Sequence, residues 1–326
     1  MSLYQKTFLV TGGAGSFGQK FTEIVLKEYD PKSIRIYDSD ELRSVEMDQR
    51  LQDSRLRVFM GDVRDKDRLG RAMNGVDIVV HAAALKHVPI CEYNPIEAVR
   101  TNVDGTVNVI DAAIANNVEK AITLSTDKAV HPVNLYGATK MVAEKLFVQG
   151  NSYVGPQKRT RLSCTRYGNV VASNGSVIPL FLEQRKYGEI RMTDERMTRF
   201  WITLEQGARF VLKSLERMQG GEIFIPKIPS MKLVDLAEAV APGVPRRIIG
   251  IRPGEKIHEV LLTEHEANHA KEFEDSFVIE PEFPFWKENG GGNEGEKMKE
   301  GFRYVSDAND WCLSPEELKR TLKEML

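Results

Sequence analysis

The sequence predicts an α/β fold, with a doubly wound parallel sheet followed by a smaller C-terminal region. Three features predict it. Short apolar runs alternate with helix-length amphipathic stretches in the first half of the chain, a glycine-rich loop follows the first run, and the alternation weakens after about Gly168. Strand-length runs separated by helices are typical of a parallel sheet that is covered on both faces.

Five apolar runs are the expected strands of this sheet. They are Thr7–Thr11, Ser33–Tyr37, Leu56–Met60, Asp77–Ala82 and Lys120–Ser125. Between them, Ser16–Tyr29 and Pro95–Asn116 are expected to be helices that cover the sheet.

Two local signals lie near the end of the chain. Lys287–Gly301 contains glycine and charged residues with almost no apolar side chain, which predicts a mobile loop. Ser314 precedes Pro315 and two acidic residues, the order in which an N-cap, a first-turn proline and early acids open a helix. The sequence therefore predicts a final helix after Ser314.

Composition excludes several classes of function. The 326 residues include 45 Lys and Arg against 47 Asp and Glu, a formal charge of −2, so we expect neither a nucleic acid nor a membrane partner. The three cysteines, Cys91, Cys164 and Cys312, lie far apart, which argues against a disulfide framework and suits a reducing compartment. Since no apolar run could span a bilayer and no signal peptide is evident, a cytoplasmic protein is expected.

Gly12, Gly15 and Gly18 directly follow the first expected strand with the spacing G-x-x-G-x-x-G. The missing side chains let the turn tighten and let the backbone approach a pyrophosphate at a helix N-terminus. Asp38 lies 20 residues beyond Gly18, at the end of the second strand, where a carboxylate can hold a ribose 2′-hydroxyl. We therefore expect a dinucleotide-binding Rossmann domain over residues 1–168. Residues 169–326 would mainly form a substrate-binding region, with part of them returning to the first domain.

Two charged side chains give opposite indications about the dinucleotide. Asp38 would repel a 2′-phosphate and favours NAD, whereas Arg43 could pair with that phosphate and favours NADP. Asp62, which follows the third strand, is placed to meet the adenine. The choice between NAD and NADP stays open at this point.

The fifth strand runs into Thr126, and Tyr136 and Lys140 follow with a spacing of four, so a helix projects both from one face. A lysine ammonium and an oxidised nicotinamide beside the phenol are expected to lower the pKa of Tyr136 from about 10 towards neutrality. Tyr136 could then remove the proton of a sugar hydroxyl that Thr126 also hydrogen-bonds, while hydride leaves the carbon. The expected cofactor-binding residues are Gly12, Gly15, Ser16, Phe17, Gly18, Asp38, Arg43, Asp62, Val63, Ala82, Ala83, Tyr136 and Lys140.

With these motifs the chain resembles the extended short-chain dehydrogenase/reductase family, and within it the inverting UDP-N-acetylglucosamine 4,6-dehydratases. The resemblance covers nearly the whole chain. It rests on Thr11–Gly18, Ala84–Pro89, Asn94-Pro95, Thr101-Asn102, Ser125–Ala129 with Tyr136 and Lys140, Arg166–Val170, Met197–Phe200 and Arg252–Lys256. The chain departs from these relatives at Asp38-Ser39, where they usually carry Ser-Arg, and this departure bears on the choice of cofactor.

The resemblance implies oxidation at C4 of the sugar, elimination of water across C5–C6, and return of the hydride to C6 with inversion at C5. It makes Lys128 the C5 base and Asp127 the acid at O6, where retaining dehydratases carry Asp-Glu and 4-epimerases have no such catalytic pair. These roles need a neutral Lys128 and a protonated Asp127, although their mutual attraction favours the opposite charges. The product would be a UDP-4-keto-6-deoxy-L-arabino-HexNAc for surface-glycan biosynthesis. The NADP or NAD would stay tightly bound and be regenerated each turnover, and the resemblance also implies a homo-oligomer.

A sugar nucleotide needs cationic partners for its diphosphate, and Arg199 and Arg252 are the best candidates, since arginine makes bidentate phosphate contacts. By resemblance, Glu255 is expected to hold a ribose hydroxyl and Asn169 the sugar or the diphosphate. Lys86 is expected near the sugar.

Two other functions and one metal motif remain as alternatives. An NAD-dependent sugar-nucleotide 4-epimerase needs only Thr126, Tyr136 and Lys140. A non-catalytic dinucleotide-binding regulator often lacks the tyrosine or the lysine, both of which are present here. His265 to His269 matches the zinc motif H-E-x-x-H, but it falls in a charged stretch with no evident third ligand, so no metal site is expected.

Overall fold

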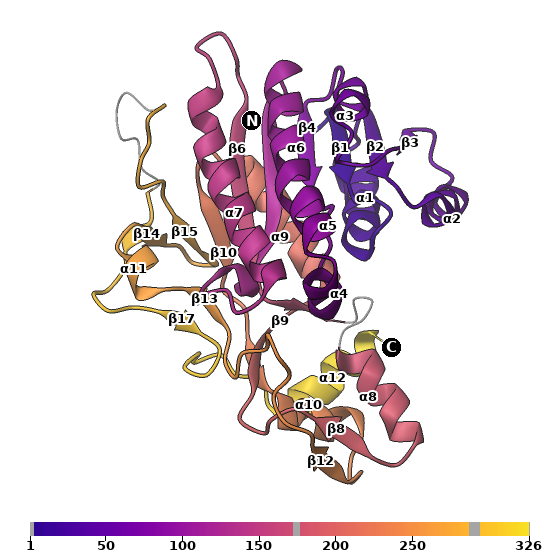
Figure 1. The fold of residues 1–326 in the computed structure, drawn as a ribbon, viewed down its shortest axis with the longest axis vertical. Coiled ribbons are helices and arrows are strands. Elements are labelled where there is room, and N and C mark those ends of the chain that lie inside the picture. The colour runs from indigo at the N-terminus through magenta and orange to yellow at the C-terminus, as the bar shows by residue number, and fades with distance from the viewer. Residues whose placement is uncertain (1–2, 172–176, 287–293, 326) are drawn as a thin grey trace.

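The computed structural model describes residues 3–171, 177–286 and 294–325. Its centre is a ten-stranded sheet with the order β16-β14-β15-β10-β6-β5-β4-β1-β2-β3 (Figure 1). The parallel part comprises β3 (Leu56–Met60), β2 (Ser33–Asp38), β1 (Thr7–Thr11), β4 (Ile78–His81), β5 (Lys120–Thr126), β6 (Arg161–Tyr167) and β10 (Ile223–Pro226). The antiparallel part adds β15 (Ser276–Ile279), β14 (Ala270–Glu272) and β16 (Glu296–Lys297). This is the doubly wound Rossmann sheet that the sequence predicts.

The strand order reverses between β1 and β4. From β1 the chain builds outward through β2 and β3, then returns to place β4, β5 and β6 on the other side. In open α/β sheets ligands bind at the carboxyl ends of the strands beside such a reversal. The fold therefore places the candidate site at the lower edge of the sheet in Figure 1.

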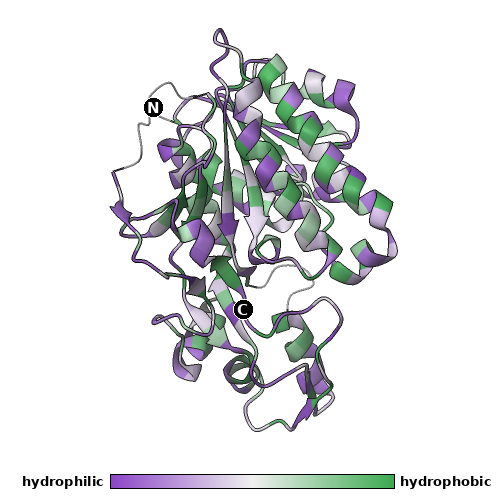
Figure 2. Ribbon diagram, turned by 60° about the vertical axis from the view of Figure 1, so that its left-hand side comes forward, coloured by the Kyte–Doolittle hydropathy of each residue, from purple (hydrophilic) through white to green (hydrophobic). Residues whose placement is uncertain are grey.

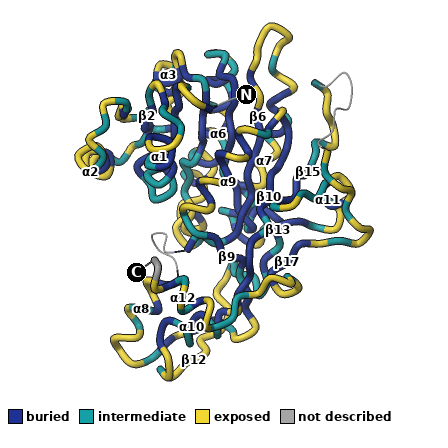
Figure 3. Tube along the Cα trace, turned by 180° about the vertical axis from the view of Figure 1, so that it is seen from behind, coloured by how far each residue is buried: buried dark blue, intermediate teal, exposed yellow. Residues whose placement is uncertain are grey.

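Two helical layers cover the sheet. One contains α3 (Lys66–Ala72), α6 (Gly105–Ala115) and α7 (Leu135–Gly150), and the other contains α1 (Ser16–Glu28) and α9 (Leu204–Arg217). The helices alternate hydrophobic and hydrophilic residues along their length (Figure 2), and the central strands are buried (Figure 3). The central strands are buried because helices cover both faces of the sheet, and the helices are amphipathic because only one of their faces packs on the sheet.

The expected strands match the observed ones to within one residue at each end. The expected helix over Pro95–Asn116 is instead interrupted, because α5 (Pro95–Val99) and α6 are joined by a π-helical turn, Arg100–Asp104. The turn buries Asn102, whose amide group bonds Leu85 O and Thr139 Oγ1 at 2.9 and 3.0 Å. A π-turn inserts one extra residue into a helix and is frequent at functional sites. Sequence periodicity does not reveal it.

The later part of the chain has a second apolar core below the sheet. Its strands are β7 (Asn169–Val170), β9 (Thr198–Ile202), β11 (Ser230–Lys232), β8 (Ile190–Met192) and β12 (Arg246–Ile248). Its helices are α8 (Val177–Lys186), α10 (Leu233–Val240) and α12 (Pro315–Met325). A short pair, β13 (Val260–Leu262) and β17 (Tyr304–Val305), joins this part to the sheet, while α9 and β10 pack in the first core. Division of the chain at residue 168 stays a prediction.

The remaining helices are α2 (Glu41–Leu51), α4 (Val88–Tyr93) and α11 (Glu264–Ala267), with 3-10 turns at Asp127–Ala129, after β5, and Asn151–Tyr153, after α7. The predicted final helix is confirmed as α12, with Ser314 Oγ accepting from the main-chain N of Glu317 at 3.2 Å. Within the predicted loop, residues 287–293 lie outside the described residues, but Glu296–Lys297 forms β16. An edge strand can pair through its main chain without apolar side chains, so this small strand left no sequence pattern. None of the described helices is long and apolar enough to cross a membrane.

Candidate active site

The glycine loop, Gly12–Gly18, leads from β1 into α1 at the carboxyl edge of the sheet. Gly12 has a φ of +65°, and a Cβ on it would lie 2.8 Å from the Cα of Ala83. A Cβ on Gly18 would lie 2.4 Å from Gly13 O. Gly15 is the N-cap of α1 and supplies no side-chain cap, so the first amides of the helix are not capped by a side chain. Uncapped amides at a helix N-terminus are a site for a pyrophosphate.

The other predicted residues of the loop region lie beside it. Ser16 and Phe17 form the first turn of α1. Ala82 N donates to Thr11 O at 3.1 Å and Ala83 N to Thr11 Oγ1 at 3.3 Å, so the end of β4 borders the loop. The structure therefore brings this set together as the sequence predicts, while their contacts with a cofactor stay predictions.

Asp38, at the end of β2, is fixed to the glycine loop. Its Oδ2 accepts from Ala14 N at 2.9 Å and its Oδ1 from Asp40 N at 3.0 Å. Arg43 lies in the first turn of α2, where its Nε is 3.3 Å from Asp40 Oδ2. The Asp38 carboxylate thus lies at the loop, and Arg43 is paired with another carboxylate, that of Asp40.

Asp62 and Val63 follow β3. The Asp62 carboxylate accepts from Arg64 Nε at 3.0 and 2.9 Å, and this hydrogen bond holds the pKa of Asp62 below its usual value. Tyr37 Oη donates to Asp62 O at 2.8 Å. The Asp62 side chain is thus already hydrogen-bonded to Arg64. Its contact with adenine stays a prediction.

Thr126 ends β5, and Asp127 and Lys128 begin the following 3-10 turn. Asp127 is fully buried, and its Oδ1 accepts from Thr126 Oγ1 and from Lys128 Nζ, both at 2.9 Å. Lys128 Nζ also donates to Asn169 Oδ1 at 3.1 Å. The second carboxylate oxygen of Asp127, Oδ2, is buried without a hydrogen-bond partner among the described residues.

The charge of Lys128 differs from what its expected role needs. Burial disfavours the ammonium, but the carboxylates of Asp127 and Glu259 outweigh burial and raise the pKa of Lys128 above its usual value. The protein's own charges therefore favour a protonated Lys128, and a neutral base has to be formed during the reaction.

Tyr136 stands in the first turn of α7, which Asn134 caps by accepting from Gly137 N at 2.8 Å. Burial raises the pKa of Tyr136 to about 12, although the Lys128 charge and a hydrogen bond with Thr126 act in the opposite direction. The lowered pKa expected from the sequence is therefore not produced by the protein groups around this tyrosine. The reason is that burial outweighs the nearby cation.

Lys140 lies one turn further along α7 and is 4% exposed. Burial lowers its pKa to about 8. Its ammonium makes no hydrogen bond or ion pair within the part of the chain that the structure describes. A buried ammonium without an acceptor fits a site in which a ligand supplies that acceptor.

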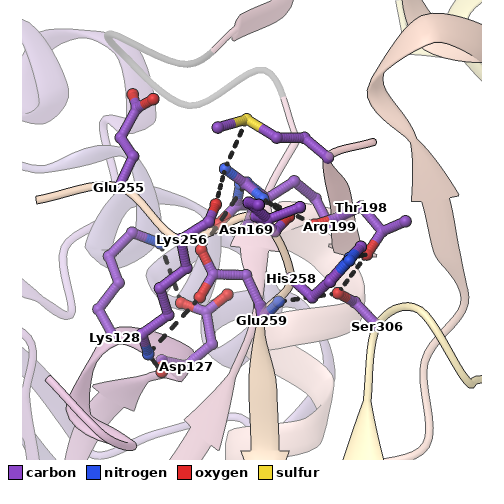
Figure 4. Close-up of polar contacts among 12 residues, drawn as sticks. Asp127, Lys128, Asn169, Thr198, Arg199, Glu255, Lys256, His258, Glu259 and Ser306 are labelled. Atoms are coloured by element: carbon purple, nitrogen blue, oxygen red, sulfur yellow. Dashed lines mark hydrogen bonds and ion pairs between the residues drawn. The ribbon is translucent and has the colours of Figure 1, made fainter. Parts of the chain in front are cut away.

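Arg199 belongs to β9 and lies 11% exposed beside the Asp127–Lys128 turn (Figure 4). Its terminal nitrogens donate to Thr198 O, Ile257 O, Lys256 O and Met197 Sδ. These contacts occupy the terminal N–H groups of the guanidinium, so a phosphate would have to replace some of them, and direct binding of the diphosphate by Arg199 stays a prediction.

Arg252 is the better diphosphate candidate. It is 54% exposed, and its nearest acidic partner is Glu255 at 3.9 Å. Glu255 Oε2 is shielded from solvent and has no hydrogen-bond partner among the described residues, so a ligand hydroxyl could donate to it.

Lys86 lies close enough to two other cations for their charges to act on it. Desolvation, followed by the charges of Arg43 and Lys128, lowers the pKa of Lys86.

Sequence reasoning missed three residues of the site. Asn134 both caps α7 and donates to Gly254 O at 2.8 Å, and Lys256 donates to Asp127 O at 3.3 Å. Glu259 is a buried carboxylate at the start of β13. One sequence signal could have pointed to Glu259: the Arg252–Lys256 motif continues through Ile257 and His258 to this second acidic residue.

The H-E-x-x-H match has a structural role. Glu266 accepts from Arg166 at 2.8 Å and caps the four-residue helix α11 through Thr263, while the rings of His265 and His269 are 6.5 Å apart. The described residues include no cluster of three or more His, Cys, Asp or Glu able to hold a metal ion.

The residues fit a nicotinamide dinucleotide. Side chains at Gly12 or Gly18 would collide with the backbone of the cradle, and Lys140 holds a buried ammonium with no described acceptor. The loop and the N-terminus of α1 would hold the pyrophosphate, Asp38 a ribose, and Lys140 a second ribose beside the nicotinamide. Fold and site together define an extended short-chain dehydrogenase/reductase.

The model of a family described as polysaccharide biosynthesis protein matches residues 8–281, and the chain belongs to this family. It is 52% identical over 322 residues to a protein of Campylobacter jejuni named UDP-N-acetylglucosamine 4,6-dehydratase (inverting), covering 96% of each chain. It is 43% identical to a protein of Rickettsia canadensis named UDP-glucose 4-epimerase, over 84% of this chain and 82% of that one. Among solved structures, Pen from Bacillus thuringiensis is 37% identical and superimposes with a TM-score of 0.89, covering 99% of this chain and 100% of that one.

Proposed function

We propose that this protein is a UDP-N-acetylglucosamine 4,6-dehydratase that inverts C5 and gives a UDP-4-keto-6-deoxy-L-arabino-HexNAc for surface-glycan biosynthesis. One observation carries the proposal. The buried carboxylate of Asp127, joined at 2.9 Å to the partly exposed Lys128, accepts a hydrogen bond from the Thr126 hydroxyl beside Tyr136. Oxidation at C4 needs only the tyrosine, threonine and Lys140, so the additional acid–base pair points to elimination.

In the first step Tyr136 accepts the O4 proton of the sugar while Thr126 hydrogen-bonds the same oxygen. Lys140 orients the neighbouring ribose. A nicotinamide dinucleotide held by the glycine loop, Asp38 and Lys140 would supply the hydride acceptor for C4 and the hydride donor for C6. The high pKa of Tyr136 in the protein alone means that charge brought by the bound ligands has to favour the phenolate.

In the elimination step Lys128 takes the C5 proton and Asp127 gives a proton to O6, which leaves as water. Transfer of one proton from Lys128 Nζ to Asp127 Oδ1 across the 2.9 Å contact turns the ion pair into the neutral base and the protonated acid that these roles need. The elimination itself takes up no outside proton. Return of the hydride to C6 leaves a carbanion at C5, and one solvent proton, delivered to the face opposite the one that Lys128 deprotonated, inverts that centre. The O4 proton that Tyr136 took up is released to solvent and balances this uptake.

We also propose NAD as the preferred dinucleotide. Asp38 places a fixed negative charge at the loop, where a 2′-phosphate would have to lie, and Arg43 is directed to Asp40. On the substrate side, Arg252 is assigned to the diphosphate, Glu255 to a ribose hydroxyl and Asn169 to the sugar.

We further propose a cytoplasmic homo-oligomer. Exposed apolar side chains gather on three helices that contact one another, α4, α5 and α7. They are Ile90, Tyr93, Ile96, Met141 and Val142. A patch of this kind suits a second copy of the chain, which light scattering after size-exclusion chromatography tests.

The test is proton NMR of the purified protein with UDP-N-acetylglucosamine in D2O. A 6-deoxy-4-keto product of L-arabino configuration with deuterium at C5 is expected. Lys128→Met should reduce C5 deuteration by at least about a hundredfold, whereas Lys145→Met, an exposed lysine of α7, should not.

The alternative is a 4-epimerase, which the name of the Rickettsia relative favours. That activity would give a 4-epimer without deuterium at C5 and would tolerate Lys128→Met. A product with retained C5 configuration would instead contradict the role of Lys128.

A further inference from the structure

Glu259 is a buried charge in the site that the mechanism above does not use. The residue is 2% exposed, and its main-chain N donates to Ser306 Oγ at 2.8 Å. Its Oε2 is buried and has no hydrogen-bond partner among the described residues. A buried carboxylate without such partners persists only if nearby cations compensate for lost hydration.

Two cations lie against this carboxylate (Figure 4). Arg199 Nε is 3.7 Å from Glu259 Oε1, and Lys256 Nζ is 3.9 Å from Oε2. Lys256 also donates to Asp127 O and Val130 O, so it connects Glu259 to the catalytic turn. Glu259 therefore belongs to the same charged cluster as the Asp127–Lys128 pair.

The charges in this cluster depend on one another. Asp127 and Lys128 face Glu259 from the turn after β5, Arg199 from β9, and Lys256 from the preceding loop. The neighbouring His258 directs Nδ1 to Thr198 Oγ1 at 2.9 Å. With Glu259 ionised, two carboxylates face three cations, a net charge of +1. Without it, Asp127 alone would face all three.

Of these cations, Lys128 is the one whose proton has to move during elimination. Arginine remains protonated in proteins, and Lys256 is committed to two carbonyl groups. Consistent with this, the Glu259 charge is one of those that raise the pKa of Lys128. Burial and the Asp127 charge in turn raise the pKa of Glu259 itself.

We propose that Glu259 is a positioning residue for the elimination step, whose buried negative charge sets how readily Lys128 releases and takes up its proton. The inference rests on the proposed function, because it assumes that Lys128 removes the C5 proton.

The test is the pH dependence of deuterium incorporation at C5 in D2O, measured by NMR for wild type and variants. Elimination needs the one proton that Asp127 and Lys128 share, so the rate of deuterium incorporation should fall at alkaline pH as the pair loses this proton to solvent. Glu259→Gln keeps the shape of the side chain and removes its charge, so this alkaline limb of the pH profile should move to lower pH by roughly one unit, the size expected for one lost neighbouring charge. Glu259→Asp keeps the charge, and its limb should stay near that of wild type even if its rate falls.

Two further variants control the interpretation. Lys256→Met removes a cation, so its limb should move to higher pH, the direction opposite to Glu259→Gln. Glu222→Gln alters a buried carboxylate that bonds Ser163 Oγ at 2.7 Å outside the site, and its limb should not move.

The outcomes separate the two proposals. Wild-type protein that places no deuterium at C5 overturns the proposed function and the inference with it. If wild type exchanges C5 while Glu259→Gln keeps the wild-type limb, or Glu222→Gln shifts it equally, only the inference is overturned. Should Glu259→Gln fail to fold, an unshifted Lys256→Met limb overturns it independently.

Discussion

Asp38 is the residue that we expect to select between NAD and NADP. Its two oxygens accept from Ala14 N and Asp40 N, which fixes a negative charge beside the glycine loop. A ribose hydroxyl can donate to such a carboxylate, whereas a 2′-phosphate is repelled by it. We therefore expect this one residue to determine the preference for NAD over NADP.

We expect Asp38→Ser to change the ratio of affinities for NAD and NADP by at least about tenfold towards NADP, the effect of roughly 1.4 kcal/mol. Isothermal titration with each dinucleotide measures it. Asp48→Asn, an exposed acid on α2, is the matched control and should leave the ratio unchanged. Equal ratios for wild type and Asp38→Ser would remove Asp38 from the specificity argument.

At the scale of the element, α7 organises the site. Its N-cap Asn134 also bonds Gly254 of the substrate-side loop, and Tyr136 and Lys140 project from its first two turns. Gly137 lets the helix pack directly on the Asp127–Ala129 turn, because a Cβ there would lie only 2.1 Å from Lys128 O. Helix and turn are therefore in contact through their backbones.

Gly137→Ala should force α7 away from the Lys128 turn and lower kcat by about a hundredfold or more, since displacement of about 1 Å in a catalytic group has this effect. The turnover assay with UDP-N-acetylglucosamine measures it, with circular dichroism to show that the helix persists. Gly70→Ala in α3 meets nothing within 4 Å and should instead stabilise the protein by about 0.5–1 kcal/mol. Full activity in Gly137→Ala would contradict the close packing of helix and turn.

At the scale of the whole molecule, buried polar groups tie the sheet to the rest of the chain. Arg166 on β6 bonds Glu144 of α7 at 2.7 Å and Glu266 of α11 at 2.8 Å. His81, at the end of β4, bonds Thr11 and Thr106 at 2.7 and 3.2 Å inside the first core. Removing one member of such a network leaves its partners unsatisfied.

His81 should make the protein sensitive to acid. Burial, followed by the Lys140 charge, lowers the pKa of His81 to about 3 from 6.5, so the unfolded chain binds the proton more readily between these pH values. Stability should therefore fall as pH drops below 6.5, by up to about 1.4 kcal/mol per unit from this group. Denaturant unfolding from pH 7 to 4 measures the slope. His81→Gln should reduce it and His265→Gln, an exposed histidine, should not; an equal slope in His81→Gln would assign acid sensitivity to other groups.

The sequence by itself determined the parallel strands of the sheet and which loop and helix carry the residues of the candidate site. Buried runs of apolar residues predict β1 to β5, because strands covered on both faces need apolar side chains at every position. The glycine loop and the Tyr136–Lys140 spacing located the two halves of the site, since turn geometry and helical periodicity are local properties.

The tertiary structure alone decided the charges and the partners. The π-turn that buries Asn102, the engagement of Arg199 by main-chain carbonyls, and the position of Glu259 behind Lys128 all depend on segments far apart in the chain. Burial and distance between such segments set the pKa values of Tyr136 and Lys128, and neither quantity is written in the order of the residues.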